Sequence, residues 1–530
     1  MADPSMPHTS PAAMSNGARM LLFAVMALGM FMSLLDVQIV AASLPEITSG
    51  LAAGADQSSW LQTSYLIAEI VMIPLSGFLA QAFSTRWLFT ASAAAFTVSS
   101  VACGFAWNIE SAIVFRAVQG FVGGAMIPTV FATGFTIFTG RQQALIPAIL
   151  GLTGTVAPIL GPTFGGWITD VLSWRWLFFI NVAPGLLICA LVPALCRIDE
   201  AEPDVLRGFD ASGLAAMALF LGGLQYVLEE GPRRDWLADP LLRGVAIASA
   251  LGAVTFVRRS FTHPRAVIDL RLFGDARFVM GCLFQFVLGI GMFSAIYLIP
   301  QYLARVQEYR SLDIGQAVFI TGVAQISATP LSAVLSRRID PRHMIVFGFS
   351  LFGLSFLQLS RLSSDWGGHE LLLPQAMRGF ATMFCIVPAT NMALGSMPPT
   401  KLKAASGLSN LMRNLGGAIG IALSNTIVDH RYQLHFSRLA DSLRASRLDE
   451  WLASAQAATG GVIADAATRQ PAAMALLVRT VNREALTMAY ADCALLFACG
   501  FFATLVIIPL SRRMPAAGAG TRRATTPRAI

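Results

Sequence analysis

The chain has few charged residues. Only 13% of its 530 residues are Asp, Glu, Lys or Arg, whereas 55% are hydrophobic and the mean hydropathy is +0.63. A soluble globular protein has about 25% charged residues. This shortage excludes an ordinary soluble protein and indicates a chain that crosses a membrane many times.

Reactive motifs are equally scarce. The seven cysteines lie in or beside apolar runs and form no CxxC pair, so we interpret them as small buried residues. The sequence contains no HExxH motif and no P-loop, and no loop presents a GxSxG motif. These absences disfavour a membrane protease, an ATP-driven pump and a lipid hydrolase. We therefore expect no enzyme activity and no metal site.

The net charge of +7 would suit a nucleic-acid partner. The arginines and lysines, however, lie in short loops between apolar runs, where membrane topology accounts for them. We therefore expect the lipid bilayer, and no nucleic acid, as the main environment of the chain.

Apolar runs long enough to cross a bilayer recur along the whole chain. One span takes about 20 apolar residues. We expect two six-helix bundles, at 19–200 and 277–510, two inserted linker helices at 201–276, and tails at 1–18 and 511–530, the first of them disordered. The sequence predicts fourteen spans, at 19–44, 57–82, 86–106, 110–138, 141–169, 174–197, 209–229, 238–258, 277–303, 312–336, 342–361, 370–394, 401–429 and 487–510.

Basic residues are distributed unevenly between alternate loops. Twenty Lys and Arg lie on the side of the N-terminus and seven in the short loops of the other side. The positive-inside rule then places both termini in the cytoplasm and the long segment 430–486 outside. In that segment arginines are interspersed with Leu, Phe and Trp, as in an amphipathic helix. It is either a docking surface for a periplasmic partner or a cap over the outer mouth.

Two stretches repeat the same order of residues. RAVQGFVGGAMIP at 116–128 and RGFATMFCIVP at 378–388 both run from arginine through glycine to proline. Each is followed by a glycine-rich span. Parallel halves with a site between them near the midplane are typical of secondary transporters.

Six charged residues lie well inside the predicted spans. An intramembrane charge costs about 2.5–3.5 kcal/mol or more, so each is a functional candidate. At 1.5 Å per residue, Asp36 and Arg116 lie at similar depths of about 12 and 9 Å, and Glu69 lies near the midplane. We predict that these three couple protons to transport. The alternative is a structural Asp36–Arg116 salt bridge and a Glu69 that is hydrogen-bonded to a neighbouring span. The secondary charges are Arg378, Arg413 and Asp492, of which Asp492 is an interfacial or packing residue in our interpretation.

Other residues inside the spans are candidates for substrate contact or for helix packing. Polar or aromatic side chains predicted to bind substrate are Gln62, Tyr65, Gln285, Tyr297, Phe384 and Asn391. Glycines and prolines within one span would break a helix in water but let neighbouring helices approach closely in a bilayer. These predicted hinge and packing residues are Gly154, Pro158, Gly161, Pro162, Gly165 and Gly166.

Four motifs together resemble the 14-span EmrB/QacA-type drug:proton antiporters of the major facilitator superfamily. They are LDVQIV at 35–40 with Leu44-Pro45, RAVQG at 116–120, the glycines and prolines of the fifth span, and WRW at 174–176 with Asn181 and Pro184-Gly185. One departure lies in GFLAQAFSTRW at 77–87, where Gln81 replaces the common Asp.

The resemblance implies a major facilitator fold and a proton-coupling role for Arg116. It also implies proton-driven efflux of hydrophobic or amphipathic drugs across a bacterial inner membrane by alternating access, with no cofactor beyond the proton gradient. A periplasmic adaptor (a membrane fusion protein) and an outer-membrane channel are its implied partners. The alternatives are a dedicated exporter of a siderophore, fatty acid or other metabolite, and an importer or channel, which the fifth-span motif disfavours.

Overall fold

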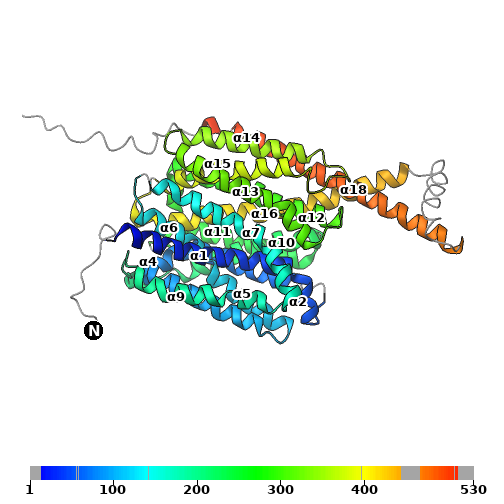
Figure 1. Ribbon diagram of the computed structural model, residues 1–530. Helices are drawn as coiled ribbons and strands as arrows, with labels where there is room; N and C mark the ends of the chain where they lie inside the picture. The colour runs from blue at the N-terminus through cyan, green and yellow to red at the C-terminus, as the bar shows by residue number, and fades with distance from the viewer. Residues whose placement is uncertain are drawn as a thin grey trace, which may run out of the picture.

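The computed structural model describes residues 14–54, 57, 59–140, 142–264, 266–395, 397–442, 466–506 and 508–510. Within these ranges every regular element is a helix, and the long helices run side by side (Figure 1). The predicted all-α membrane fold is confirmed. The predicted tail at 511–530, and most of the tail at 1–18, lie outside the described residues.

The helices follow one another through short connections. The first group comprises α1 (Asn16–Ala42), α2 (Leu44–Gly50), α4 (Trp60–Gly104), α5 (Ile109–Gly123), α6 (Met126–Ile137), α7 (Ile146–Val171), α8 (Trp176–Phe179) and α9 (Val182–Leu195). The remainder comprises η3 (Pro203–Leu206), α10 (Ala211–Glu230), α11 (Pro240–Thr262), η6 (Leu270–Gly274), α12 (Ala276–Arg305), α13 (Ser311–Leu335), α14 (Pro341–Leu359), α15 (Leu372–Leu394), α16 (Pro399–Ser442) and α18 (Ala466–Leu505).

The predicted spans coincide with helical structure, although several boundaries move. α4 covers most of both predicted spans 57–82 and 86–106, with non-helical backbone at Ser84, whose φ is +69°. The predicted span 110–138 is divided between α5 and α6. Ten helices among the described residues are long and apolar enough to cross a membrane. The total of fourteen spans stays a prediction.

Short polar side chains begin several of these helices. The Asn108 carboxamide oxygen accepts a hydrogen bond from the Ser111 N–H at 2.8 Å, and the Ser111 hydroxyl lies 3.3 Å from the Asn108 N–H. This reciprocal arrangement is a capping box, which satisfies N–H groups that lack a partner inside the helix. Asp239 and Asp275 cap α11 and α12 through their carboxylates.

Two apolar cores hold the bundle together. One lies mainly among α1, α4, α6 and α9 and contains the buried rings of Phe89, Phe96 and Phe131. The other lies mainly among α12 to α15 and α18, where the rings of Phe352 and Phe501 stack at 4.8 Å. Offset aromatic contacts of this kind stabilise a core beyond the apolar area they bury.

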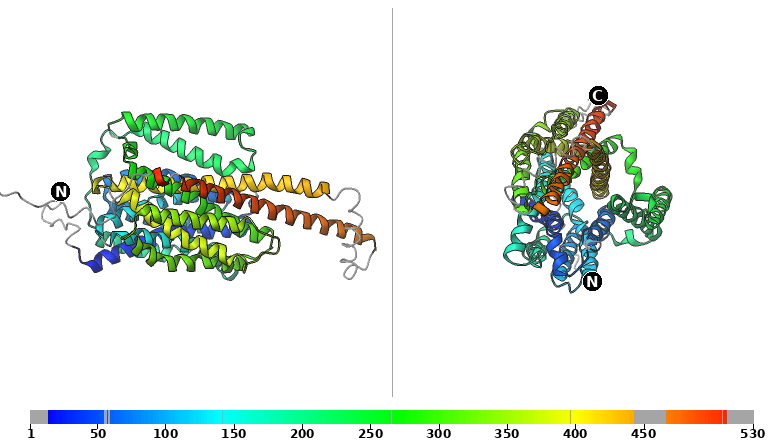
Figure 2. Two further views of the ribbon diagram at one scale, coloured as in Figure 1. Left: turned by 90° about the horizontal axis from the view of Figure 1, so that it is seen from above. Right: turned by 90° about the vertical axis from the view of Figure 1, so that its right-hand side faces the viewer.

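The helices α10 and α11 pair with each other beside the rest of the bundle (Figure 2). Asp210 fastens this pair near the start of α10, since its carboxylate accepts bonds from the Gly213 N–H and the Arg259 guanidinium, both at 2.7 Å. Burial acts to raise the pKa of Asp210, but these hydrogen bonds outweigh it and hold the pKa below its usual value. α10 also packs on α4 and α16.

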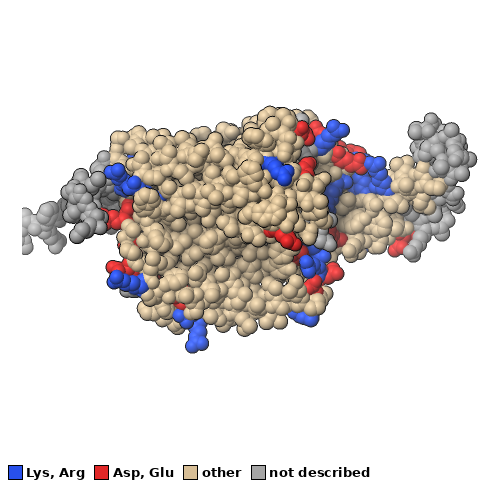
Figure 3. Space-filling model, turned by 90° about the horizontal axis from the view of Figure 1, so that it is seen from below, with Lys and Arg blue, Asp and Glu red and all other residues tan. Residues whose placement is uncertain are grey.

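The bundle has two ends, which we name by their contents. The terminal face holds the start of α1 and the start of α16, and the distal face holds α2. Charged side chains gather at these two ends and leave a broad, almost uncharged belt between them (Figure 3). Such a belt suits the hydrocarbon core of a bilayer, which is about 30 Å thick.

α16 and α18 continue past the distal face (Figures 1 and 2). α16 is therefore longer than the predicted span 401–429, and α18 begins well before the predicted span 487–510 and ends at Leu505. The Tyr432 hydroxyl donates a 2.6 Å hydrogen bond to the Asn482 carboxamide, and this bond joins the two helices where they leave the bundle.

The predicted external segment 430–486 is made, in its described parts, of these two helix extensions. Residues 430–442 belong to α16 and residues 466–486 to α18. Residues 443–465, the middle of this segment, lie outside the described residues.

Candidate functional site

A buried ion pair lies at the centre of the N-terminal helices. The Arg116 guanidinium of α5 donates to the Asp36 carboxylate of α1 at 2.5 Å, and both side chains are fully excluded from solvent. The sequence predicted that these residues lie at one depth, and the structure brings them together. A buried pair of this kind is retained only where further hydrogen bonds satisfy its remaining atoms.

Neighbouring side chains supply most of those hydrogen bonds, although Arg116 Nη2 has no partner among the described residues. Gln119 and Asn181 donate to the second carboxylate oxygen of Asp36 at 3.0 and 2.8 Å. Asn181 also donates to the Ser100 hydroxyl at 3.0 Å, and Arg116 donates to Gln119 at 2.8 Å. The Asp36 carboxylate is thus held by donors from α5 and from the turn between α8 and α9.

Arg116 is positioned by α4 as well. Its Nε donates to the Leu61 carbonyl at 3.2 Å, and the guanidinium lies 4.3 Å from the centre of the Tyr65 ring. Gly120, one turn along α5, lets the two helices approach, because a Cβ there would lie 2.2 Å from the Tyr65 carbonyl oxygen. The spacing from Arg116 to Gly120 therefore places the guanidinium directly against α4.

Glu69 lies one turn along α4 from Tyr65 and is 7% exposed. Within the described part of the chain, its carboxylate has no hydrogen-bond partner and no ion pair. The predicted alternative, a hydrogen bond from Glu69 to a neighbouring span, is therefore absent among these residues. Glu69 is therefore a buried carboxyl group that no hydrogen bond among the described residues holds in place.

A cavity of about 680 Å³ lies between the two sets of helices, toward the distal face. α1 and α4 form one wall with Gln38, Ala41, Gln62 and Leu66, while α12, α13, α15 and α16 form the other. The end of α10 and the turn after it contribute charged residues at the mouth, namely Glu229, Glu230 and Arg233. Sequence reasoning gave the inserted helices no part in the site.

The six predicted substrate residues divide into two groups. Gln62 and Tyr297 line the cavity, and the Tyr297 hydroxyl donates to Asn425 on the same wall. The remaining four are not among the lining residues. Tyr65 packs on Arg116, Gln285 donates to Thr390 at 2.6 Å, Phe384 stacks on Phe380 at 5.1 Å, and Asn391 lies near the terminal end of α15.

The terminal face is closed by contacts between the two sets of helices. Lys403 of α16 forms an ion pair with Asp199 and donates to the Ala80 carbonyl at 2.9 Å. Asp199 also accepts bonds from the Thr85 hydroxyl at 2.7 Å and the Thr85 N–H at 2.9 Å. Ser406 of α16 donates to the Pro128 carbonyl at 2.7 Å. These contacts join the two sets of helices on the side away from the central cavity.

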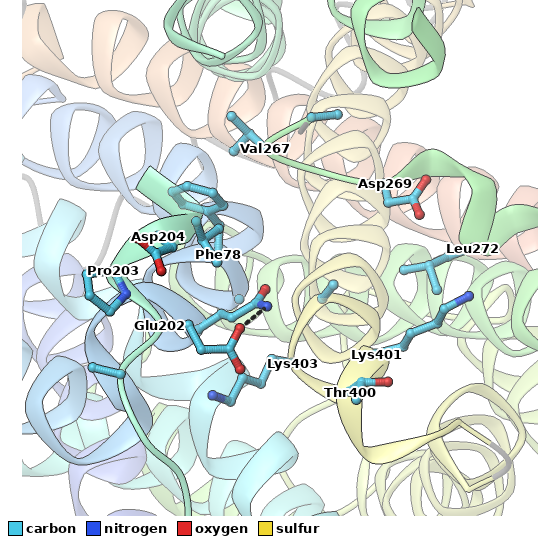
Figure 4. Close-up of a pocket in the computed structure, with 16 residues that line it drawn as sticks. Phe78, Glu202, Pro203, Asp204, Val267, Asp269, Leu272, Thr400, Lys401 and Lys403 are labelled. Atoms are coloured by element: carbon cyan, nitrogen blue, oxygen red, sulfur yellow. Dashed lines mark hydrogen bonds between the residues drawn. The ribbon is translucent and has the colours of Figure 1, made fainter. Parts of the chain in front are cut away.

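A second cavity, of about 660 Å³, lies at the terminal face beside these contacts. Figure 4 shows Lys401 and Lys403 on α16 opposite Glu202 and Asp204 of the segment after α9. Gln81, where the resemblance places an Asp, donates to Glu202 at 2.9 Å. Charged groups of both signs thus meet on this face.

The glycines of α7 set its distance from α1. A Cβ at Gly161 would lie 2.4 Å from the Gln38 Cβ, and one at Gly165 would lie 2.9 Å from the Ser43 hydroxyl. At Gly154 the nearest atom would be 3.8 Å away. Gly166 lies in the same continuous helix, and the side chains of Pro158 and Pro162 fall outside the described structure. Close packing thus needs glycine at 161 and 165 but not at 154.

The three secondary charges have different surroundings. Arg378 lines the central cavity, whereas Arg413 donates to Asn410 and lies 5.5 Å from the Phe131 ring. Asp492 accepts from Arg431 at 2.6 Å and lies 2.6 Å from His435 Nε2 at the base of the helix extensions. That location agrees with a packing role for Asp492.

Sequence comparisons agree with this geometry. The sequence model of the Major Facilitator Superfamily matches residues 26–421. The chain is 36% identical to the colistin resistance protein EmrB of Acinetobacter baumannii, over 91% of this chain and 94% of that protein. It is 30% identical to the fatty acid resistance protein FarB of Neisseria gonorrhoeae, over 79% of this chain and 82% of that protein.

A solved structure supports the fold. The proton:xylose symporter XylE superposes with a TM-score of 0.57 at 13% identity, over 93% of this chain and 97% of that one. The chain belongs to the Major Facilitator Superfamily, and within it to the EmrB-like transporters.

Proposed function

We propose that the protein exports hydrophobic or amphipathic toxic compounds across the bacterial inner membrane in exchange for protons. The observation that carries this proposal is the buried, hydrogen-bonded Asp36–Arg116 pair in a bundle whose central cavity lies toward the distal face while contacts join the halves at the terminal face. The names of the relatives, colistin resistance and fatty acid resistance, support export of compounds that are harmful to the cell.

The excess of basic residues near the terminal face supports a cytoplasmic location for that face and for both termini. The central cavity then faces the periplasm, and the contacts of Lys403 and Ser406 close the cytoplasmic side. The two halves that rock about this cavity are residues 19–200 and residues 277–510. The two inserted linker helices lie between them, at 201–276. Alternating access is the rocking of such halves around a fixed site.

Coupling rests on two carboxylates in this proposal. Arg116, Gln119 and Asn181 donate hydrogen bonds to the Asp36 carboxylate in this arrangement. In the proposal, Asp36 takes a proton when rocking of the halves moves these donors away from it. Glu69 exchanges a proton near the midplane. Proton entry from the periplasm favours release of the compound, and proton loss to the cytoplasm resets the transporter. No metal or bound cofactor takes part.

The base of the helix extensions is the proposed docking place for a periplasmic adaptor, which would link the transporter to an outer-membrane channel. α16 and α18 project beyond the distal face, where such a partner could contact them. A dedicated exporter of a siderophore, fatty acid or other metabolite is the second candidate function, and the kinship with FarB favours the fatty acid among these.

Everted membrane vesicles test the direction of transport. Addition of a substrate to energised vesicles should release protons from the lumen, since an exporter exchanges the two. Proton movement in the same direction as the substrate would indicate an importer instead. A panel of toxic compounds and metabolites in this assay separates broad efflux from a dedicated exporter.

A further inference from the structure

Arg378 is a buried cation whose charge has no acidic partner. It lies on α15, is 5% exposed and lines the central cavity. Its Nη2 donates to the Thr321 hydroxyl at 3.0 Å and to the Gln375 carboxamide at 3.2 Å. Its Nη1 is buried and has no hydrogen-bond partner among the described residues. The guanidinium is thus only half satisfied by neutral groups.

Arg116 and Arg378 occupy related positions in the repeated stretches, but only Arg116 has an acidic partner. Each arginine donates to a glutamine one helical turn away, Gln119 for Arg116 and Gln375 for Arg378. Arg116 then meets the Asp36 carboxylate, whereas Arg378 meets only the Thr321 hydroxyl. The C-terminal half therefore presents a guanidinium where the N-terminal half has a complete ion pair.

The acidic residues that line the cavity are Glu229, Glu230 and Asp429, and none of them forms an ion pair with Arg378. Glu229 and Glu230 are the last residues of α10, and Glu230 pairs with Arg234 at 3.2 Å and Arg233 at 3.8 Å. Arg378 lies six residues into α15, about 9 Å from the start of that helix. No carboxylate in the described part of the chain lies within 4.0 Å of Arg378.

An unpaired buried charge is costly, so a ligand that brings the missing anion is strongly favoured there. A guanidinium binds a carboxylate or another planar or tetrahedral oxyanion through two parallel hydrogen bonds. The free Nη1 of Arg378 supplies one of these donors without the loss of any existing contact.

The rest of the cavity wall suits an apolar body. Leu66 of α4 faces the cavity from one side, and Phe293, Ile296, Val318 and Ile421 face it from the other. A cavity of about 680 Å³ that has apolar side chains on both walls and the Arg378 guanidinium among its polar groups suits a drug-sized amphiphile.

We propose that the central cavity binds amphipathic organic anions, with the acid group on Arg378 and the apolar part against these aliphatic and aromatic side chains. This inference rests on the proposed function and names a substrate class for it. Arg378 determines specificity, whereas Asp36 and Glu69 handle the proton.

Two twelve-carbon compounds of opposite charge test the inference. Binding of laurate and of dodecyltrimethylammonium to the full-length protein in nanodiscs is measured for wild type, Arg378→Gln and Arg378→Lys. Arg378→Gln should weaken laurate binding about 10- to 100-fold and leave the quaternary ammonium unchanged or tighter. Arg378→Lys should restore part of the laurate affinity, because the charge returns without the planar fork.

Arg479→Gln is the control, since Arg479 is an exposed arginine of α18 that pairs with Glu308 and does not line the central cavity. Its preference between the two compounds should stay close to that of wild type. Equal losses for both compounds in Arg378→Gln, or a wild type that does not bind laurate, would overturn the inference.

The proposed function has a separate readout. If the wild-type protein exchanges the quaternary ammonium for protons but does not bind laurate, the proposed efflux stands and only the proposed substrate class is wrong. If it binds laurate through Arg378 but transports no compound in exchange for protons, the proposed function is wrong and the binding site stands.

Discussion

Lys403 of α16 forms an ion pair with Asp199, which follows α9, and so joins the two halves at the terminal face. Asp199 also holds Thr85 at the turn inside α4. The resemblance places a carboxylate in this loop at position 81, where the chain has Gln81. Asp199 supplies a carboxylate at the same face from a later part of the chain, so this face has a negative charge although position 81 has none.

Loss of this ion pair should open the terminal face. Lys403→Ala leaves Asp199 half-buried without its cation, and the closed arrangement loses a contact between the halves. Hydrogen–deuterium exchange of residues 77–85 and 399–407 should therefore rise. Lys401→Ala is the control, because it removes the same charge two residues away without breaking the pair. Equal exchange in the two variants would contradict the role of Lys403.

The α7 glycines offer a comparison within one helix. Gly161→Ala places a methyl group 2.4 Å from the Gln38 Cβ and should separate α1 from α7, at a cost of about 1–3 kcal/mol typical of overpacking. Gly154→Ala meets nothing closer than 3.8 Å and should be neutral or slightly stabilising. The melting temperatures of the purified variants measure both effects. Similar melting temperatures for the two variants would show that this packing does not limit stability.

The donors around Asp36 give a third prediction. Asn181→Leu removes one hydrogen bond to the buried carboxylate and should lower stability by about 1–3 kcal/mol, as for other charged buried bonds. The same substitution should reduce proton-coupled transport in wild type. In an Asp36→Asn background Asn181→Leu should cost less stability than in wild type, because both substitutions act on one group. Additive losses of stability in the double variant would indicate that Asn181 acts elsewhere.

Acid sensitivity is expected where α10 meets α11. The pKa of Asp210 is lowered in the folded protein, so its contribution to stability is present above the unfolded pKa and is lost as the pH falls through the folded one. Asp210→Asn should therefore lower the melting temperature at pH 7 and have little effect near pH 3. A constant difference at both values would rule out the ionised carboxylate as the cause.

Much of the fold could be predicted because apolar spans and intramembrane charges are visible in the sequence. The depth of Asp36 and Arg116 followed from helical rise alone. Gln119 and Asn181 lay in quoted motifs, but their common target becomes apparent only when α5 and the α8–α9 turn meet α1. The part played by α10 at the cavity mouth, and by Asp199 at the terminal face, depends on contacts between distant segments that no local pattern encodes.

Proton release in everted vesicles tests the central claim most directly. Substrate added to energised wild-type vesicles should release lumenal protons, and Asp36→Asn and Arg116→Ala should abolish that release at equal expression. Gly154→Ala should retain it. Full substrate-dependent release in both charge variants would contradict proton coupling through the Asp36–Arg116 pair.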